Sequence, residues 1–340
     1  MLLTLGVRFD MEKAILRIRN LKTYFFTRRG TVRAVDGVDF DLLKGECLCL
    51  VGESGCGKTV TALSILGLID SPPGRVVDGE IYYDNVNLLK CSPEQMRRLR
   101  GKEIAMVFQD AQSALNPVFT IGDQIAEQVK LHLGVGGGEA RQRAVDLLGE
   151  VGIPSPEKEV DYYPHQLSGG MKQRAMIAMS LSCDPQVLIA DEPTTAVDVT
   201  IKAQILDVFQ RLRETRQMSL LFITHELGVV SEIGDRMVVM YAGRLAEAAA
   251  VTELLGDPKH PYTAGLIKCV PDITKTRDRL ESIPGTVPSL IDPPRGCLFH
   301  PRCDQAMAIC SQEKPPLTMV GKGHTVFCHL YNGIKGNGEQ

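Results

Sequence analysis

Residues 47–59 read CLCLVGESGCGKT, and this stretch decides the fold. The apolar run 47–51 has the length and composition of a strand buried on both faces of a parallel sheet. A glycine-rich loop ends it, and residues 59–69, TVTALSILGLI, follow with a helical pattern. A strand, a glycine loop and a helix in this order open a βαβ unit, so the chain is predicted to be an α/β protein.

The loop GESGCGKT (52–59) fits the pattern G-x-x-x-x-G-K-[ST] in full. Its glycines let the backbone aim N–H groups at phosphate oxygens, and the helix that follows adds its positive end. Lys58 supplies a positive charge to the β- and γ-phosphates, and the Thr59 hydroxyl can ligate Mg²⁺. The alternative, a chance glycine turn, is disfavoured by the flanking strand and helix. The ATP-binding residues predicted in this segment are Gly52, Glu53, Ser54, Gly55, Cys56, Gly57, Lys58, Thr59 and Val60.

A second acidic motif, VLIADE (187–192), follows later in the chain. Four apolar residues predict a buried strand, and Asp191 comes at its carboxyl end, where α/β proteins bind ligands. Asp191 is predicted to hold the Mg²⁺ shell, normally through water. Glu192 is predicted to be the general base that orients and partly deprotonates the attacking water. The alternative is an exposed acidic turn before Pro193.

Between these two motifs lies LSGGMKQR (167–174), which resembles the signature of the ABC ATPases. The resemblance implies a P-loop NTPase fold, the ABC nucleotide-binding domain, with an inserted helical subdomain. It also implies that Ser168 and Gly170, with Gly169 between them, contact the γ-phosphate of a nucleotide held by the opposite subunit. Ser168 is also a favourable N-cap for a helix running from Met171. Taken alone, the segment could be only a capped surface helix.

Other landmarks of that family occur here in order. By resemblance, Gln109 in MVFQD ligates Mg²⁺ and senses the membrane partner, and His225 in FITHE contacts the γ-phosphate as a second catalytic residue. Asp198 in TAVD matches the D-loop, although Val197 replaces the commoner leucine. Phe25 is chosen among three neighbouring aromatic residues, 24–26, as the one that stacks on adenine. The complete set implies a competent half-site in a dimer, in which one chain supplies the P-loop and Glu192 and its partner supplies the signature.

The resemblance and the composition together suggest a domain organisation. Residues 11–261 are predicted to form the ATP-binding domain, with the helical subdomain at about 111–182, and 262–340 an irregular C-terminal extension containing cysteines. MVVMY (237–241) is expected to end the sheet. The tail is proline-rich and has little periodicity, so it should depend on something other than a large core. Met11 looks like the natural start of the folded domain, which makes residues 1–10 a frayed or alternative leader.

Net charge and hydropathy help to decide between an ABC transporter subunit and a soluble ABC ATPase. The formal net charge is −3, which gives no basic field for nucleic acid, and no apolar run is long enough to span a membrane. If the protein works at a membrane, it should therefore do so as a peripheral subunit, and the resemblance to transporter ATPases implies the cytoplasmic face of the cell membrane. A soluble ABC ATPase of DNA repair or translation is the alternative from a different class. The former would need a long coiled coil before the signature and the latter two cassettes, and the sequence has neither.

Several strings are similar to the ATP-binding subunits of dipeptide and oligopeptide importers, the Dpp/Opp D type. The strings outside the P-loop are SALNPVFTIGDQIAE (113–127), YPHQLSGGMKQR (163–174), HPYTAGL (260–266) and IPGTVPSL (283–290). The resemblance implies a second ATPase subunit, identical or different, two transmembrane permease subunits and, indirectly, an extracytoplasmic substrate-binding protein. It also places a groove for a permease helix within residues 110–165. Related systems import nickel or oligosaccharides, so the cargo stays open.

Four cysteines crowd into the irregular tail: Cys297, Cys303, Cys310 and Cys328. Four thiols in a proline-rich, weakly hydrophobic segment suit a metal centre that substitutes for a core. Zinc prefers closer cysteine pairs, but zinc and free thiols both stay open. Similar tails in this transporter branch hold a [4Fe–4S] cluster, which is therefore the predicted cofactor beside ATP and Mg²⁺. The possible alternative ligands are His300, His324 and His329.

Overall fold

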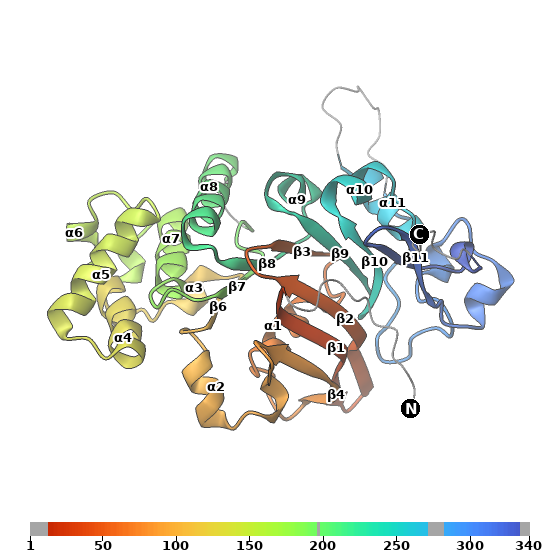
Figure 1. Ribbon diagram of the computed structural model, residues 1–340, viewed down its shortest axis with the longest axis horizontal. Helices are drawn as coiled ribbons and strands as arrows, with labels where there is room; N and C mark the ends of the chain where they lie inside the picture. Colours follow the sequence, from red (N-terminus) through yellow and green to blue (C-terminus); the bar gives the residue numbers. More distant parts are fainter. Residues whose placement is uncertain (1–12, 196–197, 271–281, 334–340) are drawn as a thin grey trace. The chain divides into compact units, whose positions relative to one another are not determined.

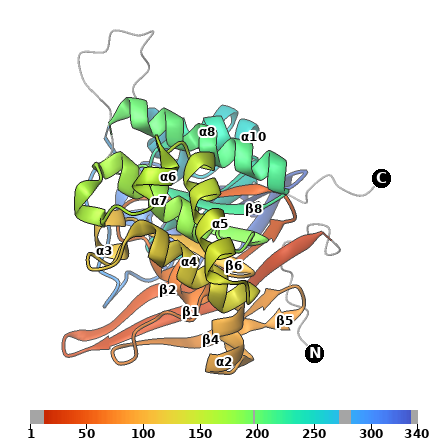
Figure 2. The same ribbon diagram turned by 90° about the vertical axis from the view of Figure 1, so that its left-hand side faces the viewer.

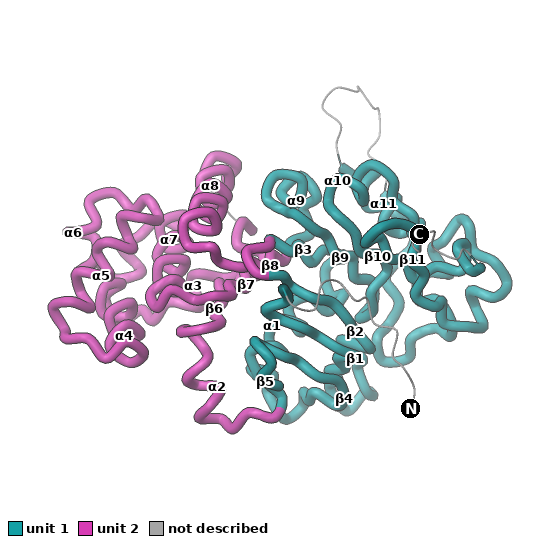
Figure 3. The backbone as a smooth tube through the Cα atoms, viewed as in Figure 1, with its two compact units in different colours: residues 1–43, 47–89, 224–340 teal, residues 44–46, 90–223 magenta. Residues whose placement is uncertain are grey.

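The computed structural model describes residues 13–195, 198–270 and 282–333, which include all the predicted site residues. The proposed leader before Met11 and Val197 of the D-loop lie outside them. The chain forms two compact units, coloured separately in Figure 3. Unit 1 comprises residues 1–43, 47–89 and 224–340, and unit 2 comprises residues 44–46 and 90–223.

Unit 1 holds an antiparallel sheet with the strand order β2-β1-β4-β5 (Figure 1). Its strands are β1 (Ala14–Thr27), β2 (Gly30–Leu43), β4 (Gly74–Tyr83) and β5 (Val86–Asn87). A tight turn at residues 28–29 joins β1 to β2. Thr23 of β1 is buried and hydrogen-bonds Ser64 of helix α1 (Lys58–Ile65) at 2.8 Å, so this sheet packs against the helix that follows the P-loop.

A second sheet of unit 1 runs in the order β11-β12-β10-β9-β3. Its strands are β3 (Cys47–Val51), β9 (Arg236–Tyr241), β10 (Arg244–Ala250), β11 (Leu317–Gly321) and β12 (His324–Phe327). All five residues of β3 are buried, as expected for an apolar strand paired in parallel with β9. The remaining helices of this unit are α9 (Leu227–Ile233), α10 (Val251–Gly256) and α11 (Pro261–Lys268), with short 3₁₀ turns at His300–Arg302, Ala308–Ser311 and His329–Tyr331.

The expectation that the sheet ends after residue 241 is wrong. Ala242 and Gly243 both adopt positive φ, 48° and 81°, and form a two-residue hairpin turn that returns the chain as β10. Strand β12 of the C-terminal extension then pairs antiparallel with β10. The sequence of β10, RLAEAAA, lacks β-branched and aromatic residues, so it gave no strand signal. The extension is irregular over much of its length, but it adds two strands, β12 and then β11, at one edge of the sheet.

Unit 2 holds three parallel strands in the order β8-β7-β6. These are β6 (Ile104–Val107), β7 (Val187–Asp191) and β8 (Ser219–Thr224), of which β7 is the buried strand predicted from VLIADE. The helices are α2 (Pro93–Leu99), α3 (Ala111–Ala114), α4 (Ile121–Leu133), α5 (Gly137–Glu150), α6 (Pro156–Glu159), α7 (Gly169–Ser180) and α8 (Val199–Arg216), and a 3₁₀ turn lies at Pro164–Gln166. Another 3₁₀ turn, Leu88–Lys90, is where the chain passes from unit 1 to unit 2.

Helices α4, α5 and α7 lie side by side within this unit, as Figures 1 and 2 both show. Thr120 caps α4 by accepting a hydrogen bond from the amide of Asp123, and Gly134 ends the helix in the left-handed conformation. The glycine-rich stretch 134–138 ends α4 and begins α5. Within the described part of the chain, no helix is both long enough and apolar enough to cross a bilayer.

Candidate functional site

The glycine-rich loop of unit 1 is held in one shape by its close approach to β2. Gly57, the N-cap of α1, has φ 106°, and a Cβ placed there would lie 2.3 Å from the carbonyl oxygen of Ala34. Only glycine can adopt this conformation at this distance from another backbone. The amide of Gly243 donates to the Cys56 carbonyl at 2.9 Å and ties the loop to the β9–β10 hairpin as well. The sequence thus fixes a curled loop at the start of a helix.

Lys58 carries the positive charge of this loop. Its side chain is buried, and its Nζ donates to the carbonyl oxygens of Gly52 at 2.8 Å and Glu53 at 3.2 Å. Ser54 and Thr59 are exposed beside it. Backbone amides at a helix start, a fixed ammonium and an exposed hydroxyl together suit a polyphosphate with its Mg²⁺.

The three neighbouring aromatic residues of β1 differ in what they contact. Tyr24 donates from its hydroxyl to Asp36 at 2.7 Å, and burial together with this carboxylate raises the pKa of Tyr24 to about 12. The ring of Phe25 packs against the backbone at Gly74, because a Cβ there would meet its Cε1 at 2.8 Å. Phe26 is 54% exposed. The choice of Phe25 for adenine stacking stays a prediction, and Phe26 has the more accessible ring.

In unit 2, the carboxylate of Glu192 is oriented by two neighbours. Gln109 Nε2 donates to Glu192 Oε2 at 3.0 Å, and the Thr195 hydroxyl donates to the same oxygen at 3.1 Å. Glu192 has φ 46°, an unfavourable left-handed conformation for this residue, and its amide donates to Ile223 at 2.9 Å. Asp191, directly before it, is buried at the end of β7. A held carboxylate at the carboxyl end of a parallel strand can orient a water molecule.

The signature segment and the D-loop residue both contact Ile201 of α8 in the same unit. Ser168 caps α7 by accepting from the amide of Met171 at 3.3 Å, so the predicted cap is confirmed, although the helix begins at Gly169. Asp198 caps α8 by accepting from the amide of Ile201 at 2.9 Å. A Cβ on Gly170 would lie 2.9 Å from the side chain of Ile201, so a glycine is needed for α7 to approach α8 this closely.

The predicted site residues are divided between the units. Unit 1 carries the P-loop, Phe25 and His225, which is exposed directly after β8. Unit 2 carries the remaining residues, namely Gln109, Ser168, Gly169, Gly170, Asp191, Glu192 and Asp198. Sequence reasoning missed two residues that contact the loop, Tyr262 and Arg302 of the C-terminal region. The string HPYTAGL, which contains Tyr262, was noted only as a resemblance.

The four tail cysteines lie within electrostatic range of one another. Burial, with the other three thiols adding to it, raises the pKa of Cys328 to about 11. The amide of Cys297 donates to the carbonyl of Cys310 at 2.8 Å, which joins two of the four segments. Even so, no group of three or more His, Cys, Asp or Glu side chains in residues 13–195, 198–270 and 282–333 is arranged to hold a metal ion. The geometry therefore gives the predicted cluster no support beyond proximity of the thiols.

The three tail histidines have other partners. Both ring nitrogens of His324 face carboxylates, Glu247 at 2.6 Å and Glu253 at 3.0 Å. The Nε2 of His329 lies 2.9 Å from the Glu313 carbonyl oxygen, and the Nδ1 of His300 lies 2.8 Å from the carbonyl oxygen of Cys297. These contacts give the three rings structural roles.

Two family models match the chain. Residues 35–195 match the model described as ABC transporter, and residues 246–310 match the C-terminal region of oligopeptide/dipeptide transporters. The chain is 49% identical to the oligopeptide transport ATP-binding protein AppD of Bacillus subtilis, covering 93% of this chain and 97% of the relative. It is 45% identical to the dipeptide transport ATP-binding protein DppD of Escherichia coli, covering 93% and 96%.

Solved structures agree on the fold. The ATP-binding cassette MJ0796 with ADP and phosphate has a TM-score of 0.63 at 24% identity, covering 69% of this chain and 98% of that one. CbiO1 of Clostridium perfringens, described as part of an ABC transporter complex, has a TM-score of 0.62 at 25% identity, covering 72% and 92%. The predicted P-loop NTPase fold is confirmed.

Proposed function

Because this chain belongs to the ABC transporter family of ATP-binding proteins, we propose that it binds and hydrolyses ATP to power the import of dipeptides or oligopeptides. One observation carries the proposal. A complete P-loop, folded at the start of α1, occurs in a chain that matches peptide-transport ATP-binding proteins over more than nine tenths of its length. Import of nickel or an oligosaccharide is the alternative cargo.

The site residues divide the chemistry among them. The P-loop amides and Lys58 bind the phosphates, and Thr59, Gln109 and Asp191 offer the oxygen ligands that Mg²⁺ prefers. When bound, Mg²⁺ neutralises charge on the transferred phosphoryl group. Glu192 orients the attacking water, while His225 contacts the γ-phosphate. Ser168, Gly169 and Gly170 serve the nucleotide of a partner ATPase, and Asp198 caps α8, the helix whose Ile201 lies against Gly170.

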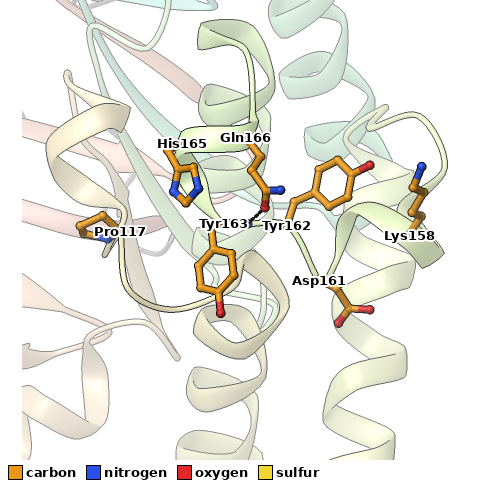
Figure 4. Close-up of a pocket in the computed structure, with 7 residues that line it drawn as sticks. All are labelled: Pro117, Lys158, Asp161, Tyr162, Tyr163, His165 and Gln166. Atoms are coloured by element: carbon orange, nitrogen blue, oxygen red, sulfur yellow. Dashed lines mark hydrogen bonds between the residues drawn. The ribbon is translucent and has the colours of Figure 1, made fainter.

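The helical region of unit 2 offers a surface for a permease subunit. An open pocket of about 680 Å³ is lined by one residue of the segment before α4 and six residues of the stretch 158–166, namely Pro117, Lys158, Asp161, Tyr162, Tyr163, His165 and Gln166 (Figure 4). Next to Pro117 in sequence, Val118 is 71% exposed and Phe119 53% exposed. A pocket of this size beside exposed apolar side chains suits the end of an amphipathic helix. We therefore place the coupling surface here, and with it a peripheral position at the cytoplasmic face of the membrane.

The partners follow from the same family: two permease subunits, a second ATPase and, indirectly, an extracytoplasmic binding protein. The domain division at residues 11–261 and 262–340, with a helical subdomain at about 111–182, is part of the proposal. The [4Fe–4S] cluster is also retained as a proposal. Its support is the donor chemistry of Cys297, Cys303, Cys310 and Cys328, whose side chains are not arranged as a metal-binding group in this structure. When bound it would cross-link the irregular tail, and no step of ATP hydrolysis depends on it.

The test is purification of the native complex through this chain, followed by reconstitution with its binding protein in vesicles. Two permease subunits should co-purify, and ATP hydrolysis should rise when a di- or oligopeptide is supplied outside. Stimulation by nickel or an oligosaccharide instead would change the cargo, and a chain that purifies alone and hydrolyses no ATP would overturn the function.

A further inference from the structure

The C-terminal extension contacts the P-loop directly through Arg302 and Glu53. Arg302 Nη1 lies 3.1 Å from Glu53 Oε1 and 3.0 Å from Oε2, although 249 residues separate the two in sequence. The Arg302 side chain is 6% exposed and that of Glu53 is 26% exposed. Glu53 is the second residue of the loop GESGCGKT, so this ion pair fixes the side of the loop nearest β3.

All three nitrogens of the Arg302 guanidinium donate hydrogen bonds. Nε donates to the Pro284 carbonyl at 2.8 Å, Nη2 to the Ile283 carbonyl at 3.3 Å, and Nη1 also to the Tyr241 hydroxyl at 3.3 Å. The ring of Phe299 lies against it, with the guanidinium carbon 6.0 Å from the ring centre. A buried guanidinium whose three nitrogens are all hydrogen-bonded has one orientation, so it holds its carboxylate partner in one place.

Tyr262 holds the backbone of the same loop residue. The amide of Glu53 donates to the Tyr262 hydroxyl at 3.0 Å, and this ring is completely buried at the start of α11. Tyr262 packs on Tyr241 and Phe299, with ring centres 4.6 Å and 5.3 Å apart. Side chain and amide of Glu53 are thus both fixed by residues beyond 261. In this structure the Glu53 amide therefore binds the Tyr262 hydroxyl and helps to hold the loop in its curled shape.

We propose that Arg302 and Tyr262 are positioning residues for nucleotide binding, through which the C-terminal extension holds the P-loop in its phosphate-binding shape. Neither residue belongs to the loop GESGCGKT that is predicted to bind the phosphates. They act through Glu53, whose carbonyl oxygen in turn accepts from Lys58 and from the amide of Cys56. Releasing Glu53 therefore frees the segment that orients the phosphate-binding lysine. This inference rests on the proposed ATP-binding function of the loop.

The test measures the Kd of a fluorescent ATP analogue with Mg²⁺ on full-length chains whose folding is checked by circular dichroism. Arg302→Gln should weaken binding roughly tenfold, and Arg302→Lys, which keeps the charge without the fork, should recover part of the loss. Glu53→Gln should weaken binding too, and the double variant should lose no more than the stronger single one, because both changes break one link. Arg295→Gln, an exposed arginine of the same extension, should bind as wild type does.

Tyr262→Phe keeps the buried ring and removes only the hydroxyl, so it tests the inference even if Arg302→Gln does not fold. Its Kd should rise several-fold at unchanged secondary structure. Wild-type affinity in folded Arg302→Gln, or in Tyr262→Phe if the former does not fold, would overturn the inference, as would fully additive effects of Arg302→Gln and Glu53→Gln. If wild type and Arg295→Gln also fail to bind the analogue, the proposed function itself fails.

Discussion

Gln109 Nε2 donates a 3.0 Å hydrogen bond to Oε2 of Glu192, and so joins the loop after β6 to the end of β7. Parallel strands that are neighbours in a sheet end at the same edge, which is why two residues 83 positions apart meet. The Thr195 hydroxyl shares the same oxygen. The Glu192 carboxylate is thus pre-oriented, and the residue that the family links to the membrane partner touches the residue predicted to activate water.

Glu192→Gln should abolish ATP turnover while leaving ATP binding unchanged. The amide oxygen can still accept from Gln109 and Thr195, but it can no longer take a proton, which costs a factor of about 10² or more in kcat. ATP should then accumulate in a closed dimer, visible by size-exclusion chromatography with the partner ATPase present. Glu214→Gln, an exposed glutamate of α8, serves as the control. Normal turnover in Glu192→Gln would show that another group is the base.

Lys58→Ala should weaken ATP binding itself. The substitution removes the charge that the loop carbonyls of Gly52 and Glu53 hold in place, and a charge-assisted hydrogen bond contributes about 1.5–3 kcal/mol. Isothermal titration should give a Kd for ATP raised at least about tenfold. Lys44→Ala changes an exposed lysine outside the loop and should bind normally. Equal affinities in the two variants would contradict the role of Lys58.

Phe119→Ser should separate the chain from its permease. Phe119 is 53% exposed and lies two positions after Pro117, which lines the pocket of Figure 4. The change therefore costs little folding free energy but removes apolar contact area from the proposed coupling surface. Co-purified permease should fall while the isolated chain binds ATP as before. Val86→Ser, a similarly exposed apolar residue of β5, should leave the complex whole. Retention of the permease by Phe119→Ser would move the coupling surface elsewhere.

His324 should make the docking of the C-terminal strands depend on pH. Both ring nitrogens face carboxylates, on β10 and α10, so both must donate, which requires a protonated ring. Burial opposes this charge, but Glu247 and Glu253 outweigh it and raise the pKa of His324, while hydrogen bonds from His324 and nearby amides lower the pKa of buried Glu247. The stabilisation is therefore complete below the ordinary histidine pKa of about 6.5 and is lost as pH rises through the raised value.

Thermal unfolding from pH 6 to pH 9 checks this dependence. His324→Gln should lower the free energy of unfolding by about 3 kcal/mol near pH 6, because it leaves the buried Glu247 without its charged partner. That deficit should shrink towards pH 9, where wild type loses the same interaction. His132→Gln on α4 is the control. A deficit that stays constant or grows with pH would mean that His324 is neutral in the folded chain.

The cluster prediction can be decided on anaerobically purified protein. Wild type should show broad visible absorption and contain about four irons per chain. Cys303→Ser should lose the colour and most of the iron, while Cys269→Ser, a cysteine outside the four, should keep both. A colourless, iron-free and fully folded wild type would rule the cluster out.

The sequence by itself determined the features that are built from residues next to one another in the chain. GESGCGKT carries its own glycines, lysine and helix start, and LSGGMKQR carries its own N-cap, so both could be recognised one segment at a time. Apolar runs such as VLIAD likewise predicted buried strands. In each case the physical cause, a turn conformation, a cap or a hydrophobic strand, acts over a few neighbouring residues.

Only the tertiary structure decided how the C-terminal extension is used. The sequence of β12 gives little indication of a strand, and this segment becomes one by pairing with β10. The sequence of β10 is itself an alanine run that favours a helix. The pairing of Arg302 with Glu53 spans 249 residues, and no local pattern identifies two such partners. Propensity and spacing describe the chain near each residue, whereas a strand edge or a buried ion pair exists only once packing has brought distant segments together.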